Sequence, residues 1–225
     1  MAPCKSDTKV RRQIMRIAHP ILVAVSASAV AALVLLSGAA SAVEEPPHRV
    51  AARDGDFEIR DYPALSVAEV TMPGDRNSAA YAGFRKLARF IFGANARKQR
   101  IEMTAPVIEA RAGGAMTAST LGEPAGSNPS WVIRFIMPHG FSLADLPNPD
   151  DLSIRLREEP PTRFAVLRFS GLAGDDAVAA KTDELESILK SRHLVSAGPP
   201  IIAQYNPPWT PWFMRRNEVM IPIRK

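Results

Sequence analysis

Cysteine is almost absent from this sequence, because Cys4 is the only one among 225 residues. Cys4 lies in an N-terminal segment that we expect to be removed, so residues 43–225 contain no cysteine. That part of the chain can form no disulfide, no thiolate metal site and no cysteine nucleophile. A domain without such links has to be stabilised by its apolar core.

Histidine is sparse as well, and the common catalytic motifs are missing. Residues 43–225 contain three histidines, His48, His139 and His193, which stand alone and lack the spacing of metal ligands. The chain has no G-x-S-x-G motif, no phosphate-binding loop and no H-E-x-x-H motif. Glu158 and Glu159 are adjacent carboxylates, but neighbouring residues of a strand point to opposite faces. We therefore expect a binding protein and not an enzyme.

The first 42 residues have the pattern of an export signal. Five basic residues precede an apolar run of 17 residues from Pro20 to Leu36, and Ala40-Ser41-Ala42 supplies the small side chains that a signal peptidase needs. We expect cleavage after Ala42 and a periplasmic or other extracytoplasmic protein. The alternative is an uncleaved membrane anchor, because the apolar run reaches the short end of a membrane span.

Little net charge is left once this segment is set apart. The whole chain has 28 basic and 23 acidic residues, a balance of +5. Residues 1–42 contain five basic residues and one acidic residue, so residues 43–225 have 23 − 22 = +1. A nearly neutral domain gives no support for a nucleic-acid partner. Membrane contact is expected only through residues 1–42, if they stay uncleaved.

Residues 43–225 contain an internal duplication. Gly74-Asp75 and Gly174-Asp175 lie 100 residues apart, and each pair follows two strand-like segments and precedes an amphipathic helical stretch. Two further strand-like segments follow each helix. The pattern predicts a ββαββ repeat at about 55–138 and a second at about 151–225, with residues 112–130 as a long hairpin loop.

The fold expected from this pattern is α+β. Eight strands and two helices, at about 77–92 and 177–192, predict an open, barrel-like antiparallel sheet that carries its helices outside. Asp75 and Asp175 lie near the helix starts, where a carboxylate accepts hydrogen bonds from free backbone N–H groups. We interpret both as capping residues and not as metal ligands.

Two groups of residues could serve binding. Arg215 and Arg216 follow a segment rich in proline and tryptophan at 207–213, so they could hold a carboxylate beside apolar rings, or form a ladder with Glu218 that only fixes the last strand. Both interpretations stay open. Four methionines near strands are expected mainly to fill gaps in the core: Met103, Met137, Met214 and Met220.

Several collinear segments resemble the SOUL haem-binding family from about residue 48 onward. The specific ones are Met103-Thr104-Ala105-Pro106-Val107 and the stretch from Tyr205-Asn206-Pro207-Pro208 to Arg215-Arg216-Asn217-Glu218-Val219. Supporting matches include the segment from Phe57 to Tyr62 and Ile136-Met137-Pro138. The resemblance implies a distorted antiparallel β-barrel made of two pseudo-symmetric ββαββ repeats with two helices.

The resemblance also implies a non-covalent haem or other porphyrin in an apolar groove beside the first helix, with arginines contacting the propionates. The implied ligand-binding residues are Tyr81, Phe84, Leu87, Ala88, Arg89, Met214 and Arg215. Asp61 stands where some members have a histidine proposed as axial ligand, so histidine ligation of the iron is not expected there. The alternative function is an envelope effector-sensing or protein-interaction module, with a protein partner docking on residues 207–213.

Overall fold

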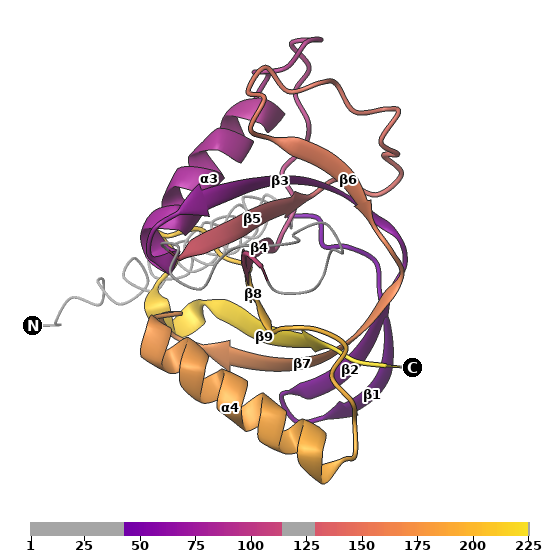
Figure 1. The fold of residues 1–225 in the computed structure, drawn as a ribbon, viewed down its shortest axis with the longest axis vertical. Helices are drawn as coiled ribbons and strands as arrows, with labels where there is room; N and C mark the ends of the chain where they lie inside the picture. Colours follow the sequence, from indigo (N-terminus) through magenta and orange to yellow (C-terminus); the bar gives the residue numbers. More distant parts are fainter. Residues whose placement is uncertain (1–42, 114–128, 225) are drawn as a thin grey trace, which may run out of the picture. The chain divides into compact units, whose positions relative to one another are not determined.

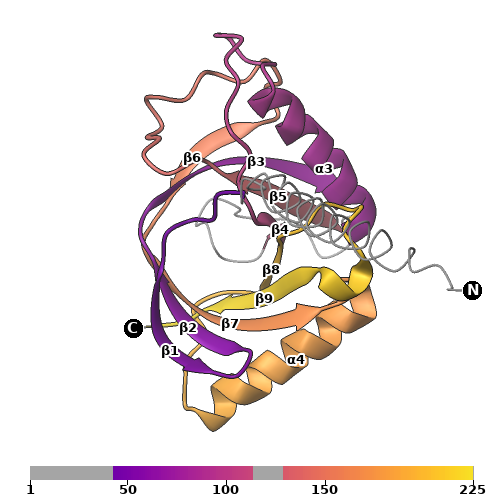
Figure 2. The same cartoon turned by 180° about the vertical axis from the view of Figure 1, so that it is seen from behind.

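The structure is a computed structural model that describes residues 43–113 and 129–224. The predicted leader at 1–42 and most of the predicted loop at 112–130 lie outside these residues. The described part is α+β, as predicted, with nine antiparallel strands in one curled sheet and two long helices outside it (Figures 1 and 2). The strands are β1 (Arg49–Asp54), β2 (Phe57–Tyr62), β3 (Leu65–Pro73), β4 (Val107–Arg111), β5 (Ser130–Ile136), β6 (Arg155–Glu159), β7 (Thr162–Ser170), β8 (Ile201–Gln204) and β9 (Arg216–Pro222).

The strand order supports the predicted duplication. It runs β1-β2-β7-β9-β8-β4-β5-β3-β6. If the two repeats are exchanged, so that β2 is replaced by β6, β3 by β7, β4 by β8 and β5 by β9, the order from β2 to β6 reads the same in reverse. The first strand of each repeat therefore pairs with the other repeat: β2 with β7, and β6 with β3.

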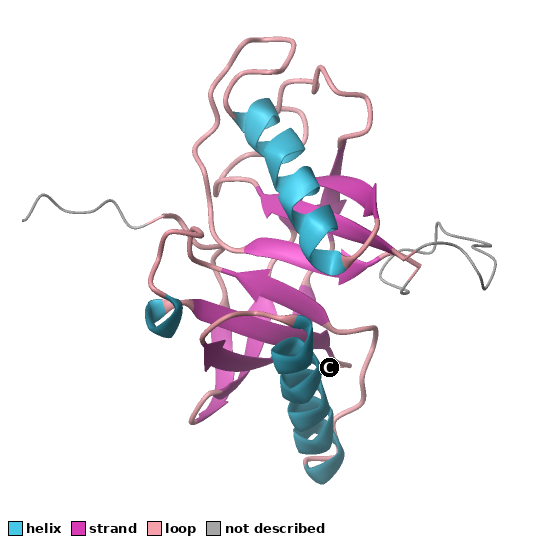
Figure 3. Cartoon of the chain, turned by 90° about the vertical axis from the view of Figure 1, so that its left-hand side faces the viewer, coloured by secondary structure: helices cyan, strands magenta, loops and turns pink. Residues whose placement is uncertain are grey.

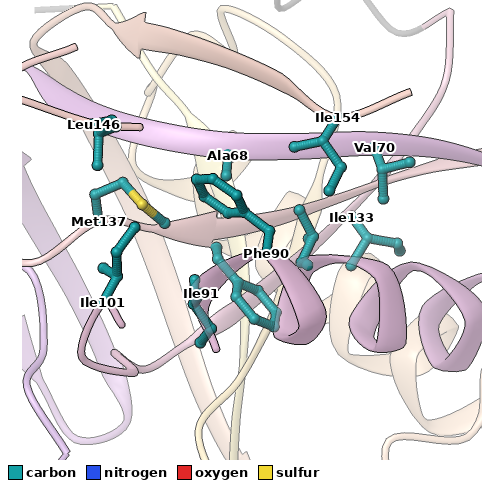
Figure 4. Close-up of a cluster of buried hydrophobic side chains, with 11 residues drawn as sticks. Ala68, Val70, Phe90, Ile91, Ile101, Ile133, Met137, Leu146 and Ile154 are labelled. Carbon is teal, nitrogen blue, oxygen red and sulfur yellow. The ribbon is translucent and has the colours of Figure 1, made fainter. Parts of the chain in front are cut away.

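Helix α3 (Arg76–Ile91) covers the outer face of the first repeat. Its buried side packs on β3 and β5, where Leu87, Phe90 and Ile91 meet Val70 and Ile133 (Figure 4). Gly83 allows this close approach, because a Cβ atom added there would lie 2.5 Å from Cγ1 of Ile133. The helix and the sheet are thus in direct contact at this point.

Helix α4 (Asp175–Ser191) covers the outer face of the second repeat in the same way (Figure 3). Leu185 and Leu189 are buried against residues of β7 and β9. The capping prediction is confirmed for Asp75, whose carboxylate accepts a hydrogen bond from the Ser78 backbone N–H at 2.9 Å. It is wrong for Asp175, because Gly174 is the N-cap of α4 and Asp175 instead forms an ion pair with Nε of Arg76 at 2.8 Å.

The inner face of the curled sheet holds its own apolar cluster, to which Val67, Ile108, Val166 and Met220 contribute. Among the described residues no helix is long and apolar enough to cross a membrane. A few element boundaries differ from those expected. Helix α3 begins one residue and helix α4 two residues before the predicted starts, and strand β1 was not predicted.

Candidate functional site

The predicted helical ligand residues lie on different sides of α3. Tyr81 is 67% exposed and Arg89 is exposed, whereas Phe84 and Ala88 are half-buried between the outer face and the core. Leu87 is fully buried beneath the helix and holds it to the sheet. The outer face of α3 thus presents aromatic and basic groups, and Leu87 supports it from below.

The outer face of α3 combines aromatic rings with uncompensated positive charge. The guanidinium carbon of Arg85 lies 5.8 Å from the centroid of the Tyr81 ring. Within the described residues, neither Arg85 nor Arg89 forms an ion pair with a carboxylate. Guanidinium groups next to apolar surface suit a flat ligand that carries carboxylates at its edge.

The two equivalent helices differ sharply in charge. Helix α3 has four basic residues and no acidic ones, a balance of +4, although one of them, Arg76, is buried. Helix α4 has two lysines and five acidic residues, 2 − 5 = −3, and it has no aromatic residue. Only the first repeat therefore offers a basic, aromatic helix face to a ligand.

A cleft of about 240 Å³ borders the C-terminal half of α3. It is lined by Lys86, Arg89, Phe90 and Ile154, together with two carboxylates, Asp150 and Asp151, of the connector between the repeats. Lys86 donates a hydrogen bond to Asp151 at 2.8 Å, and this contact holds the pKa of Asp151 well below its ordinary value. Arg89 thus lies where the outer face of α3 meets a polar recess.

The other two predicted ligand residues belong to a different segment. Met214 is 64% exposed in η1 (Trp212–Met214), a short 3-10 turn before β9. The Arg215 guanidinium donates hydrogen bonds to the backbone carbonyls of Pro208 and Thr210, the latter at 2.9 Å. Arg216 forms an ion pair with Glu218 at 2.9 Å, which is the ladder that the sequence left as an alternative.

Inside the curl lies a small cavity of about 60 Å³ with mainly apolar walls. Tyr62, Val67, Ile108 and Phe164 contribute to these walls, and Arg134 and Glu159 add charge. Pockets for drug-sized ligands have volumes of about 300–1,000 Å³. The interior cavity is therefore too small for a macrocycle, whereas the open face of α3 sets no such limit.

Two quartets of charged residues flank the interior apolar cluster at equivalent places in the two repeats. The first quartet consists of Glu58, Arg60, Arg168 and Glu218, and Arg60 contacts Glu58 at 2.6 Å and Glu218 at 2.7 Å. Burial alone raises the pKa of Glu218, but hydrogen bonds and charge from Arg60 outweigh it and keep that pKa below its ordinary value.

The second quartet occupies corresponding strand positions with every sign reversed. The strand registers place Arg157, Glu159, Glu69 and Arg134 at the positions equivalent to Glu58, Arg60, Arg168 and Glu218, in that order. Arg134 contacts Glu69 at 2.8 Å and Glu159 at 3.4 Å, as its counterpart Glu218 contacts Arg168 and Arg60. These residues are engaged in ion pairs within the fold. Glu158 is exposed on the opposite face of β6 from Glu159, so the two adjacent carboxylates do not face each other.

Asp61, the position linked to histidine in the family resemblance, is fully engaged by arginines. Arg163 donates two hydrogen bonds to its carboxylate, at 2.6 and 2.9 Å, and Arg49 adds a third at 2.5 Å. The bonds from Arg163 are the main reason why the pKa of Asp61 is lowered to about 2. Within residues 43–113 and 129–224, no group of three or more His, Cys, Asp or Glu residues could hold a metal ion.

Sequence reasoning missed Arg85 as a site residue and missed the contrast between the helices. Both signals were present in the sequence, since α3 lacks acidic residues and α4 is rich in them. The charged quartets were harder to find. The members of each quartet lie on three strands that are far apart in the sequence, and only the pairing of those strands brings them together.

Comparison with known proteins identifies a family whose model matches this chain. A family model described as "SOUL heme-binding protein" matches residues 43–222. Human heme-binding protein 2 is 42% identical over 74 residues, which cover 31% of this chain and 36% of that protein. The aligned segment thus spans only about a third of the length of this curated relative.

Solved structures with a similar fold are much more distant in sequence. The C-terminal domain of EcmrR matches with a TM-score of 0.50 at 12% identity, over 75% of this chain and 97% of that domain. A protein described as a hydrolase from Listeria innocua matches with a TM-score of 0.51 at 12% identity, over 77% of this chain and 94% of that one. At such low identity these likenesses show the fold alone.

Proposed function

Because the chain belongs to the SOUL heme-binding protein family, we propose that it binds haem or another tetrapyrrole on the outer face of α3. The observation that carries the proposal is the basic and aromatic character of this face, which α4 lacks. Tyr81, Phe84 and Ala88 would cover one side of the ring, and Arg85 and Arg89 would meet its propionates. Met214 and Arg215 lie on a separate segment and have no assigned part in this contact.

The residues of α3 fit the ring and its carboxylates better than they fit an iron ion. The helix contains no histidine, cysteine or methionine, and the Tyr81 hydroxyl is its one group of a type that ligates haem iron. Asp61 is held by two arginines and is a poor ligand for haem iron. We therefore propose that the macrocycle is held by apolar contact and arginine–propionate pairs without a histidine ligand.

Apolar contact alone can supply useful affinity. Burial of several hundred Å² at about 25 cal/mol per Å² corresponds to micromolar dissociation constants once the cost of association is subtracted. Each arginine–propionate pair should add about tenfold in affinity, which equals ~1.4 kcal/mol.

The test is a titration of the full chain with hemin and with metal-free protoporphyrin IX, followed by absorbance and fluorescence. We expect dissociation constants well below about 100 μM for both ligands and about tenfold weaker binding by Arg89→Glu. Lys190→Glu is the matched control, because Lys190 is the basic residue in the last turn of α4 as Arg89 is in α3. Absence of binding below about 100 μM, or equal binding by Arg89→Glu and the unaltered chain, would contradict the proposal.

The N-terminal sequence supports a proposal about the compartment in which the protein works. We propose that residues 1–42 direct the protein out of the cytoplasm, where the binding domain then works in the periplasm or another extracytoplasmic space. N-terminal sequencing of the protein from its envelope fraction should give Val43 as the first residue. Recovery of the intact chain from the cytoplasm would contradict this expectation.

A further inference from the structure

Four large apolar side chains are concentrated on the loop between β8 and β9. We call residues 206–215 the aromatic loop. Trp209 is 82% exposed, Trp212 62%, Phe213 61% and Met214 64%. Single exposed apolar residues are common on protein surfaces, but a cluster of this kind marks a contact surface.

The aromatic loop is held in one shape by its own backbone contacts. Arg215 donates to the carbonyls of Pro208 and Thr210, and the Met214 N–H donates to the Pro211 carbonyl at 2.9 Å. The three prolines of the loop have no N–H group to satisfy. The rings of Trp212 and Phe213 also pack edge to face, with centroids 5.8 Å apart.

These internal contacts of the backbone matter for the kind of surface that the loop can enter. A segment that leaves water must satisfy its N–H and C=O groups internally, because an unsatisfied group costs several kcal/mol in lipid. The aromatic loop meets part of this requirement before any partner arrives, because the N–H groups of Thr210, Met214 and Arg215 donate to carbonyls within it. These contacts lower the cost of removing the loop backbone from water, and the exposed side chains can enter the headgroup layer, where the remaining N–H and C=O groups still meet water.

Charge around the loop favours an anionic surface. Residues 205–217 contain two arginines and no aspartate or glutamate. Arg216 is paired with Glu45 at 2.8 Å and with Glu218, whereas Arg215 contacts only carbonyl oxygens among the described residues. The charge of Arg215 thus remains uncompensated at the base of the loop.

We infer that the aromatic loop inserts into the interfacial layer of a bilayer that contains anionic lipids. Tryptophan, with an apolar body and one N–H group, is enriched at this layer, and basic residues next to it are attracted to anionic headgroups. A protein partner is less favoured, because protein interfaces surround their apolar centre with a polar rim. Between Pro207 and Met214 the polar groups of the side chains are the Thr210 hydroxyl and the two indole N–H groups, and none is charged.

The test uses the full chain and a local readout. The chain has three tryptophans, so in Trp131→Phe the emission comes only from the aromatic loop. The protein is mixed with phosphatidylcholine vesicles with or without phosphatidylglycerol, made with ordinary or brominated acyl chains. We expect a blue shift with the anionic vesicles and quenching of the emission by brominated lipid. Residues 1–42 contain no tryptophan, so insertion of that segment alone adds no emission of its own to this signal.

A second pair of variants tests the side chains themselves. In the Trp131→Phe background, the double change Phe213→Ser with Met214→Ser should weaken binding to the anionic vesicles, measured by the blue shift, by about tenfold, because two apolar side chains that would enter the lipid are lost. Leu152→Ser is the control, since Leu152 is 95% exposed but lies in another loop, and it should behave as the parent does. Thermal unfolding monitored by circular dichroism verifies that each variant is folded.

Several results would overturn the inference. One is tryptophan emission that ignores brominated lipid although the chain sediments with the vesicles. Another is equal behaviour of the double variant and its parent. Capture of one defined protein by a photocrosslinker at position 213, combined with emission that ignores lipid, would replace the lipid surface with a protein partner. None of these results would affect the tetrapyrrole titration, which depends on α3.

Discussion

At the scale of single residues, the interior of the sheet depends on charges that compensate one another. The side chains of Arg60 and Glu218 are 2% and 0% exposed, and two hydrogen bonds of 2.7 and 3.0 Å join them. Removing a charge from water costs several kcal/mol, and attraction offsets this cost only while both partners are present. Each of these two charges can therefore be buried at low cost only while the other is present.

The change Arg60→Met tests this dependence. It leaves Glu218 buried without its main partner, so we expect the free energy of unfolding to fall by about 3 kcal/mol, as measured by urea titration. The loss should lie at the lower end of the range for such pairs, because Arg216 and Tyr205 still contact the Glu218 carboxylate.

Arg49→Met is the control for an exposed pair. The Arg49 side chain is 72% exposed, and its partner Asp61 keeps the two hydrogen bonds from Arg163. We expect a loss of less than about 1 kcal/mol, as for other surface pairs. Similar losses for Arg49→Met and Arg60→Met would mean that burial does not set the strength of these ion pairs.

At the scale of elements, α3 and α4 are equivalent in position but differ in what fixes them to the sheet. Helix α3 comes so close to β5 that a glycine, Gly83, is needed at the contact. This close contact keeps the outer face of α3 in a fixed place relative to the sheet. The proposed tetrapyrrole site therefore depends on a residue that no ligand would touch.

Gly83→Ala should disturb this contact. The added methyl group would lie 2.5 Å from Cγ1 and 2.8 Å from Cβ of Ile133, so the helix has to shift outward. Overpacking costs about 1–3 kcal/mol, and the higher helix propensity of alanine returns about 1 kcal/mol. We expect a net loss of up to about 2 kcal/mol in thermal or urea unfolding. Gly174→Ala, whose methyl group meets no atom within 4 Å, should cost less than about 1 kcal/mol. A stabilised Gly83→Ala would contradict this view of the contact.

At the scale of the whole domain, each repeat depends on the other, because the first strand of each repeat pairs with a strand of the other repeat. β2 pairs with β7 along its whole length, and β6 pairs with β3. A single repeat would therefore lose one of its neighbouring strands and expose the apolar interior cluster. The pseudo-symmetric halves form one cooperative unit and not two small domains.

Separate expression of residues 43–150 and 151–225 tests this dependence. We expect neither fragment alone to give a cooperative unfolding transition by circular dichroism, because each lacks a strand that the other supplies. An equimolar mixture, refolded together, should regain a single transition. Independent cooperative unfolding of either fragment would show that the exchanged strand is dispensable.

Much of this architecture was accessible from the sequence, because the two Gly-Asp pairs mark the repeats and the helices have clear apolar faces. β1 was missed for a physical reason. All six of its residues are exposed, so its sequence has no alternation of apolar and polar side chains, and it lies at an edge of the sheet. Its charged side chains also suit an edge strand, since they discourage pairing with other chains.

The candidate site was only partly predictable. Tyr81 and Arg89 could be assigned through the family resemblance, but the buried position of Leu87 depends on how α3 packs against the sheet. The role of Arg215 in holding the aromatic loop depends on hydrogen bonds to carbonyls of Pro208 and Thr210. Contacts of this kind carry no signal in residue type or spacing.

The pairing of β2 with β7 also determines when the chain can reach its native state as it leaves the ribosome. About 100 residues separate Phe57 from Thr162, so at 5–20 residues per second β2 waits roughly 5–20 s for its inner neighbour. During that interval the growing chain exposes open strand edges and apolar side chains. Chaperones that bind exposed apolar segments would be expected to contact the chain during this interval, until β7 is made and closes the sheet on β2.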